Sequence, residues 1–142
     1  MGLAQSGVFR REAGVVKPLD YAIFQDHGYR GLYGGLGQTD IHRRKKLQPS
    51  QKILDHMGST ELAANLFRAT QTEDKLRREG IKGKDRANQT HHEVGQKVRQ
   101  TIRELGGTMP EDLPGVRSIK EIERLQKRAQ GGKKRITGRK IK

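Results

Sequence analysis

Residues 59–80 read STELAANLFRATQTEDKLRREG and carry the clearest helical pattern in the chain. Apolar residues recur there at three- and four-residue spacings, which places them on one face of a helix from Ser59 to Glu79. They are Leu62, Ala63, Leu66, Phe67, Ala69 and Leu76. The opposite face is charged with balanced signs, and Gly80 is a typical helix-ending residue. We therefore expect the apolar face of this helix to pack into the core.

A second helical pattern follows a short basic loop. From Asp85 to Leu105 the spacing of the apolar stripe is 4-3-4-4-3, and Gly106 and Gly107 end the pattern. The stripe consists of Ala87, His91, Val94, Val98, Ile102 and Leu105. Two long helices joined by a short loop favour an antiparallel pair. The sequence therefore predicts a mainly α fold, a small helical domain built on this pair.

The segments that flank the helix pair have weaker patterns. Residues 20–35 hold all three tyrosines and four glycines, which predicts a short element followed by turns. Its aromatic residues are expected mainly in the core, with stacking of nucleic-acid bases as the alternative. Shorter helices are expected over 41–46, around 49–57 and over 118–130. About a fifth of the residues are Leu, Ile, Val or Phe, so the core should be modest. We expect one helical domain over 1–130 and a disordered basic tail over 131–142.

The net charge of +14 is the strongest indication of a partner. Half of it lies in residues 107–142, while residues 58–80 are neutral. An excess of this size attracts phosphate groups, anionic lipids or acidic proteins. We interpret three basic groups as candidate nucleic-acid contacts, although each could instead be a solvated surface. They are Arg43, Arg44, Lys45 and Lys46; then Lys82, Lys84 and Arg86; and then Lys133, Lys134 and Arg135.

The sequence gives little support for catalysis or for a cofactor. There is no cysteine, and no two of the five histidines have the i, i+4 spacing of a helical metal site. The glycine cluster lacks a phosphate-binding GxxxxGK[ST] motif. Asp20, Asp26 and Asp40 match no nuclease template. We expect a protein that is not an enzyme, with no catalytic residues, metal or cofactor, no small-molecule substrate, no membrane segment and a cytoplasmic location.

Three long segments resemble the DNA damage-inducible protein D (DinD) family, in the same order. They are DYAIFQDHGYRGLYGG over 20–35, KILDHMGSTELAANLFRATQTE over 52–73 and VGQKVRQTIRELGGTMPEDLP over 94–114. The resemblance implies a bacterial protein of the DNA damage (SOS) response, often found on mobile elements. Members are associated with control of RecA-coated DNA filaments and have no known set of catalytic residues. The family usually has an additional N-terminal half of the BRO type, linked to DNA binding, to which no part of this chain corresponds.

Charge and resemblance together lead to one main hypothesis. The chain is expected to bind DNA or a RecA–DNA filament without catalysing a reaction. Two alternatives remain open at this stage. One is a mobile-element regulator that binds another protein, of the antirepressor or anti-restriction type, and the other is a metal-dependent nuclease.

Overall fold

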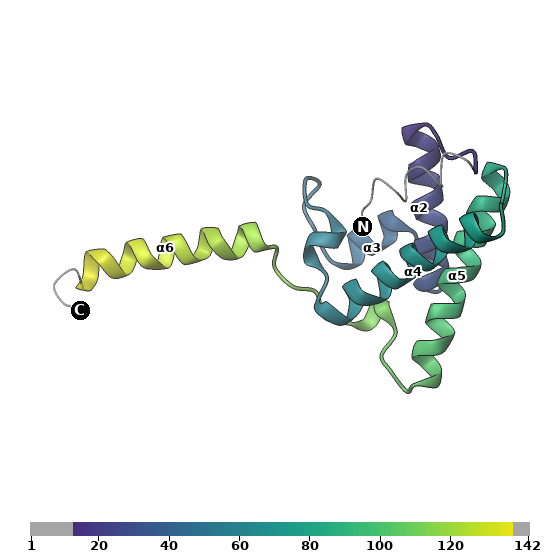
Figure 1. The fold of residues 1–142 in the computed structure, drawn as a ribbon. Coiled ribbons are helices and arrows are strands. Elements are labelled where there is room, and N and C mark those ends of the chain that lie inside the picture. The colour runs from purple at the N-terminus through teal and green to yellow at the C-terminus, as the bar shows by residue number, and fades with distance from the viewer. Residues whose placement is uncertain (1–12, 138–142) are drawn as a thin grey trace.

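The computed structural model describes residues 13–137 and is mainly helical, as the sequence predicts. Within that range there is no β-strand, only an isolated bridge between Met57 and Gly115. The helices are α2 (Pro18–Leu32), α3 (Gln38–Arg44), η1 (Ile53–His56), α4 (Ser59–Arg78), α5 (Lys84–Glu104), η2 (Pro110–Asp112) and α6 (Ile119–Thr137). Helices α2 to α5 form a packed body, and α6 projects away from it (Figure 1). No helix in the described range is long and apolar enough to cross a membrane.

The glycine- and tyrosine-rich segment forms a continuous helix, so the prediction of a short element followed by turns is wrong. Helix α2 runs beside α5 in the same direction, from the contact of Asp20 with Lys84 to that of Leu32 with Arg99. Its glycines allow the two backbones to approach closely. A Cβ atom on Gly31 would lie 2.1 Å from the carbonyl oxygen of His92. The glycines are present because this helix crossing leaves no room for side chains.

Helices α4 and α5 form the predicted antiparallel pair. The chain runs along them in opposite directions on the two sides of the turn around Gly80 and Gly83, and the helices diverge with distance from the turn (Figure 1). Both glycines have positive φ angles, 58° and 93°, a conformation that other residues rarely adopt. The two helices are therefore close together at the turn and further apart at their other ends.

The prediction of which face of α4 is buried holds for Leu76 and in part for Leu62, and is wrong for Leu66 and Phe67. Leu66 and Phe67 are 54% and 55% exposed, whereas Glu61, Asn65, Arg68 and Thr72 are buried at helical spacing. Partners from outside α4 lie just after α2 and α3 and on α5, where Tyr33, Lys45 and His91 provide hydrogen-bonding groups. Apolar spacing identified the helix correctly, but its rotation about its own axis is set by a polar network.

The apolar core is small and consists of two clusters. Six of its residues, Ala13, Val15, Phe24, Leu76, Ile81 and Ala87, form the cluster nearer the α4–α5 turn. The other cluster contains Tyr29, Leu32, Tyr33, Ile41, Ile53, Met57 and Val98. Three of the aromatic residues of segment 20–35 are therefore in the core, and Tyr21 is partly exposed.

The shorter elements agree with the predictions only in part. Helix α3 ends at Arg44, and Lys46 has a positive φ of 57° just after it. The helix expected around 49–57 is reduced to η1, because His56 pairs its carbonyl with the backbone N–H of Val116 at 3.0 Å. Helix α6 extends to Thr137, so residues 131–137 are helical where disorder was predicted. Residues 138–142 of that predicted tail lie outside the described residues.

Candidate nucleic-acid interface

A chain of buried polar side chains fixes the orientation of α4. Glu61 accepts a hydrogen bond from Lys45 Nζ at 2.7 Å and another from the hydroxyl of Tyr33. Asn65 Nδ2 donates to the same hydroxyl at 2.9 Å. Burial and the bond to Glu61 raise the pKa of Tyr33, so this phenol stays protonated and donates.

The polar chain continues to Arg68 and His91. Arg68 donates from Nη2 to Asn65 Oδ1 at 3.1 Å and from Nη1 to Nε2 of His91, while His91 Nδ1 donates to the Phe24 carbonyl at 2.8 Å. Burial lowers the pKa of Arg68, whose guanidinium lies 4.8 Å from the centre of the Tyr29 ring. Because each of these groups has a fixed partner, α4 cannot rotate to bury Phe67 instead.

The basic run at the end of α3 has one enclosed cation, Lys45, and three exposed ones, of which Arg44 pairs with Asp112 and Arg43 with Asp40. Lys45 is only 9% exposed and is bound to Glu61, so its ammonium is enclosed. Arg44 donates to the Glu111 carbonyl and to Asp112, both at 2.8 Å, and so ties α3 to η2. Arg43 and Lys46 remain exposed and available to a partner. We therefore regard Arg43 and Lys46 as the part of this run that can reach phosphate.

The second predicted group lies at the α4–α5 turn. The side chains of Lys82, Lys84 and Arg86 are exposed. The Nζ atom of Lys84 lies 3.4 Å from Oδ1 of Asp20. Among the residues that the structure describes, Lys82 and Arg86 form no salt bridge. These two cations are therefore free to bind an anionic partner.

The fold adds cations of α4 and α5 to this group. We define the α4–α5 surface as the seven cations at the end of α4, in the turn and along α5. They are Lys75, Arg77, Arg78, Lys82, Lys84, Arg86 and Lys97. Four carboxylates of the same segments lie among them, on Asp74, Glu79, Asp85 and Glu93, and Asp20 of α2 lies beside Lys84. With Asp20 counted, the net excess is two positive charges.

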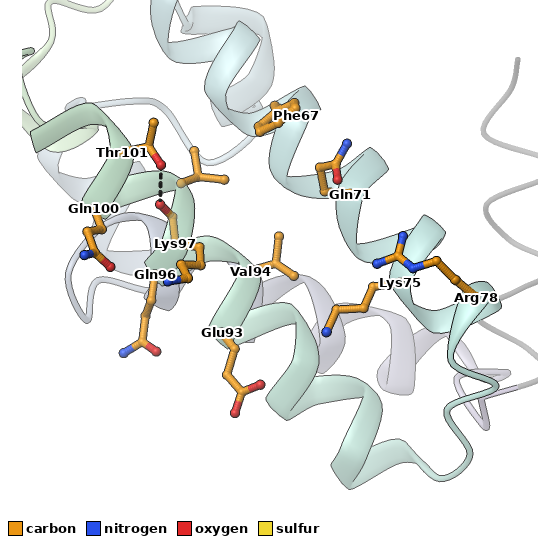
Figure 2. A pocket seen from close by; sticks show the side chains of 11 residues that line it. Phe67, Gln71, Lys75, Arg78, Glu93, Val94, Gln96, Lys97, Gln100 and Thr101 are labelled. Carbon is orange, nitrogen blue, oxygen red and sulfur yellow. Dashed lines mark hydrogen bonds between the residues drawn. The ribbon is translucent and has the colours of Figure 1, made fainter. Parts of the chain in front are cut away.

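A groove of about 610 Å³ opens between α4 and α5 on this surface. Its α4 wall carries Phe67, Gln71, Lys75 and Arg78, and its α5 wall carries Lys97 among other polar residues (Figure 2). Lys97 lies in the middle of α5 and forms no salt bridge with any described residue. Sequence reasoning missed this site because Phe67 was assigned to the core and Lys97 was in none of the three predicted basic groups. Two apolar residues in succession, Leu66 and Phe67, were the available signal, since a helix cannot easily bury both.

The third predicted group, Lys133, Lys134 and Arg135, lies in the last turns of α6. The backbone is helical there, and the side chains are outside the part of the chain that the structure describes. The contribution of this group to binding stays a prediction.

The aspartates considered for metal-dependent chemistry accept hydrogen bonds from backbone N–H groups at the starts of α2 and α3. Asp20 accepts from the N–H of Lys17 at 3.2 Å, Asp40 from that of Gly37 at 2.9 Å, and Asp26 from that of Gln38 at 2.8 Å. Hydrogen bonds from Gln38 and Arg30 lower the pKa of Asp26, although burial opposes them. Within residues 13–137, no three histidine or carboxylate side chains lie close enough together to share a metal ion.

Two comparisons with known proteins match this chain to one family. The sequence model described as the DinD C-terminal domain matches residues 6–122 of the chain. The chain belongs to the DinD C-terminal domain family. It is also similar to a protein of Escherichia coli strain K12 named DNA damage-inducible protein D, with 68% identity over 114 residues. The matched region is 80% of this chain and 42% of that relative. This DinD C-terminal domain thus spans less than half the length of the relative, and no solved structure matches it.

Proposed function

We propose that this DinD C-terminal domain acts in the DNA damage response by binding DNA or a RecA–DNA filament, without catalysing a reaction itself. The observation that carries the proposal is that the end of α4, the turn and α5 carry the seven cations of the α4–α5 surface, of which Lys75, Arg78 and Lys97 line one groove. The 68% identical relative named DNA damage-inducible protein D supports the damage-response part.

The ion pairs on this surface do not prevent phosphate binding. Lys75 Nζ lies 2.7 Å from Glu79 Oε2, and Arg77 and Arg78 both contact Asp74. The side chains of these groups are between 34% and 57% exposed, and exposed pairs contribute only about 0–1 kcal/mol. A phosphate group can therefore take the place of a carboxylate at small cost. Lys82, Arg86 and Lys97 need no such exchange.

Binding through phosphates has a measurable signature in its salt dependence. Each cation that neutralises a phosphate contributes about 0.9 to the slope of log affinity against log salt for duplex DNA, and about 0.7 for single strands. If three cations make such contacts, the slope should be roughly −2 to −3. Such a surface would bind many sequences alike, because phosphate contacts carry no base information.

The experiment is a fluorescence anisotropy titration of labelled DNA at increasing salt, with sedimentation of RecA filaments as a second readout. The test variant is Lys82→Gln/Lys84→Gln/Arg86→Gln, and the matched control is Lys17→Gln/Lys52→Gln/Arg103→Gln, which removes the same charge from other exposed positions. The test variant should lose at least tenfold in affinity and the control much less. An absence of binding at low salt, together with no sedimentation with RecA filaments, would exclude the proposal. Plasmid left intact by the protein with Mg²⁺ or Mn²⁺ is the result expected of a protein that is not a nuclease.

A second candidate function is a regulator that binds another protein. The observation that favours it is the exposure of Leu66 beside Phe67, since adjacent exposed apolar side chains often mark protein contacts. A complex of this kind would survive nuclease treatment and would depend little on salt, which separates it from DNA binding.

A further inference from the structure

Phe67 has an unusual position for an aromatic residue in this protein. Its side chain lies on the rim of the α4–α5 groove and is 55% exposed, whereas Phe24, the other phenylalanine in the described range, is 1% exposed. The exposure is fixed by the fold, because Glu61, Asn65 and Arg68 hold the opposite face of α4 in the core. An exposed ring held in place by its helix is suited to stacking against a flat partner.

We propose that the α4–α5 groove binds single-stranded DNA, with an unpaired base stacked on the ring of Phe67. This inference rests on the proposed function and narrows it to one type of strand and one site. In a duplex the faces of the bases are stacked on one another and are closed to a protein side chain. A ring that stacks on a base therefore favours a strand whose bases are unpaired.

The composition of the groove favours a nucleic-acid strand over a protein helix. Eight of its eleven lining residues are polar or charged, and Phe67 is the only aromatic one. A groove that receives an amphipathic helix needs apolar anchors along its length. On α5 the groove is lined by two valines, Val94 and Val98, and by the polar residues Glu93, Gln96, Lys97, Gln100 and Thr101. Val94 points toward α4, whereas Gln96 and Gln100 point away from it (Figure 2). Amide, ammonium and hydroxyl groups of this kind suit the phosphates, sugars and base edges of a strand.

The charges and the size of the groove agree with this occupant. Lys75 and Arg78 line it from α4 and Lys97 from α5, so a strand lying between the helices has cations on both sides. Glu93 is the one carboxylate among the lining residues. The volume of about 610 Å³ lies within the range of roughly 300–1,000 Å³ that is typical of ligand sites. A stacked base with its sugar and phosphate belongs to that size class.

The test compares a labelled 20-mer of thymidine with a 20-bp duplex, using the full chain and two alanine variants. Phe67→Ala should weaken binding of the single strand roughly tenfold and change duplex binding less than twofold. Leu66→Ala is the matched control, since Leu66 is equally exposed but does not line the groove. It should leave both affinities unchanged. Thermal melts should show that both variants remain folded.

A direct test of stacking uses the absence of tryptophan from the chain. The Phe67→Trp variant has a single indole, whose fluorescence should be quenched when the thymidine 20-mer binds and much less when the duplex binds. The same change at Leu66 should give no quenching with either DNA. This readout reports a contact between ring and base, which a purely structural role for Phe67 would not produce.

The outcomes separate this inference from the function it rests on. If the full chain binds neither DNA, both are overturned. If it binds DNA but Phe67→Ala leaves the single-strand affinity unchanged and Phe67→Trp is not quenched, only the inference fails. If Phe67→Ala abolishes sedimentation with RecA filaments while binding of free DNA is unchanged, the residue contacts protein and the inference also fails.

Discussion

Substitution of Gly31 by alanine tests the close crossing of α2 and α5. An added Cβ atom would lie 2.1 Å from the His92 carbonyl oxygen and 3.1 Å from the Gln96 backbone nitrogen, against an ordinary contact distance of 3.4 Å or more. The first of these atoms belongs to the backbone of α5, so the helices must move apart by about 1.3 Å or bend. Overpacking of this kind costs about 1–3 kcal/mol, and separation also loosens the contacts of Leu32 and Val98.

Helix propensity favours the alanine variant, whereas the steric contact disfavours it. Whether Tm rises or falls therefore shows which of the two effects is larger. Alanine in place of glycine inside a helix stabilises it by about 1 kcal/mol. Because the 2.1 Å contact is with a backbone atom, we expect a steric cost near the upper end of that range, about 3 kcal/mol, which leaves a net loss of about 2 kcal/mol and a fall in Tm of roughly 5–10 °C. The reverse change at an exposed helical position, Ala63→Gly, measures the propensity effect in the same protein. A Gly31→Ala variant that melts at or above the temperature of the unaltered chain would show that the helices do not approach as described.

Two further predictions concern paired charges. Arg99 donates two hydrogen bonds of 2.8 Å to Glu111, and although burial opposes ionisation, these bonds lower the pKa of the carboxyl group. Since its pKa is lowered on folding, Glu111 contributes stability above its usual value of 4.5 and loses it as pH falls through the folded value. Glu111→Gln should therefore lower Tm at pH 7 and flatten the fall in Tm between about pH 5 and 3; an unchanged acid profile would contradict this. Lys45→Met leaves Glu61 charged and buried and should cost about 3–5 kcal/mol in urea unfolding, with part of the loss recovered by adding Glu61→Gln. A loss below 1 kcal/mol would mean that this pair is not enclosed.

The helical class and the α4–α5 pair could be predicted because they depend on local spacing. Three- and four-residue repeats of apolar residues, with glycines at the ends, can be recognised in the sequence without knowledge of tertiary contacts. The DinD resemblance was likewise readable, since it extends over three uninterrupted segments.

The crossing of α2 on α5 and the rotation of α4 could not be predicted in the same way. Gly28 and Gly31 look like helix breakers until the backbone of α5 is placed beside them. Arg68 and Asn65 look like surface residues until Tyr33 and His91 are brought to them from other helices. Both features depend on contacts between residues distant in sequence.

In the candidate site too, some features follow from the local sequence and others depend on contacts between distant residues. The exposure of Lys82 and Arg86 follows from their place in the short loop between two helices and in the first turn of the helix after it. The position of Lys45 depends on Glu61, 16 residues away, and no local pattern marks that lysine as buried. Phe67 joins the site only because the polar face of α4 occupies the core.

Binding of DNA by the α4–α5 surface is tested most directly by the salt dependence of affinity for the unaltered chain and for Lys82→Gln/Lys84→Gln/Arg86→Gln. We predict a slope of log affinity against log salt of roughly −2 to −3 for the unaltered chain. In the variant its magnitude should be smaller by about 0.7–0.9 for each removed cation that contacts phosphate. The same slope and affinity in both proteins would contradict binding through this surface.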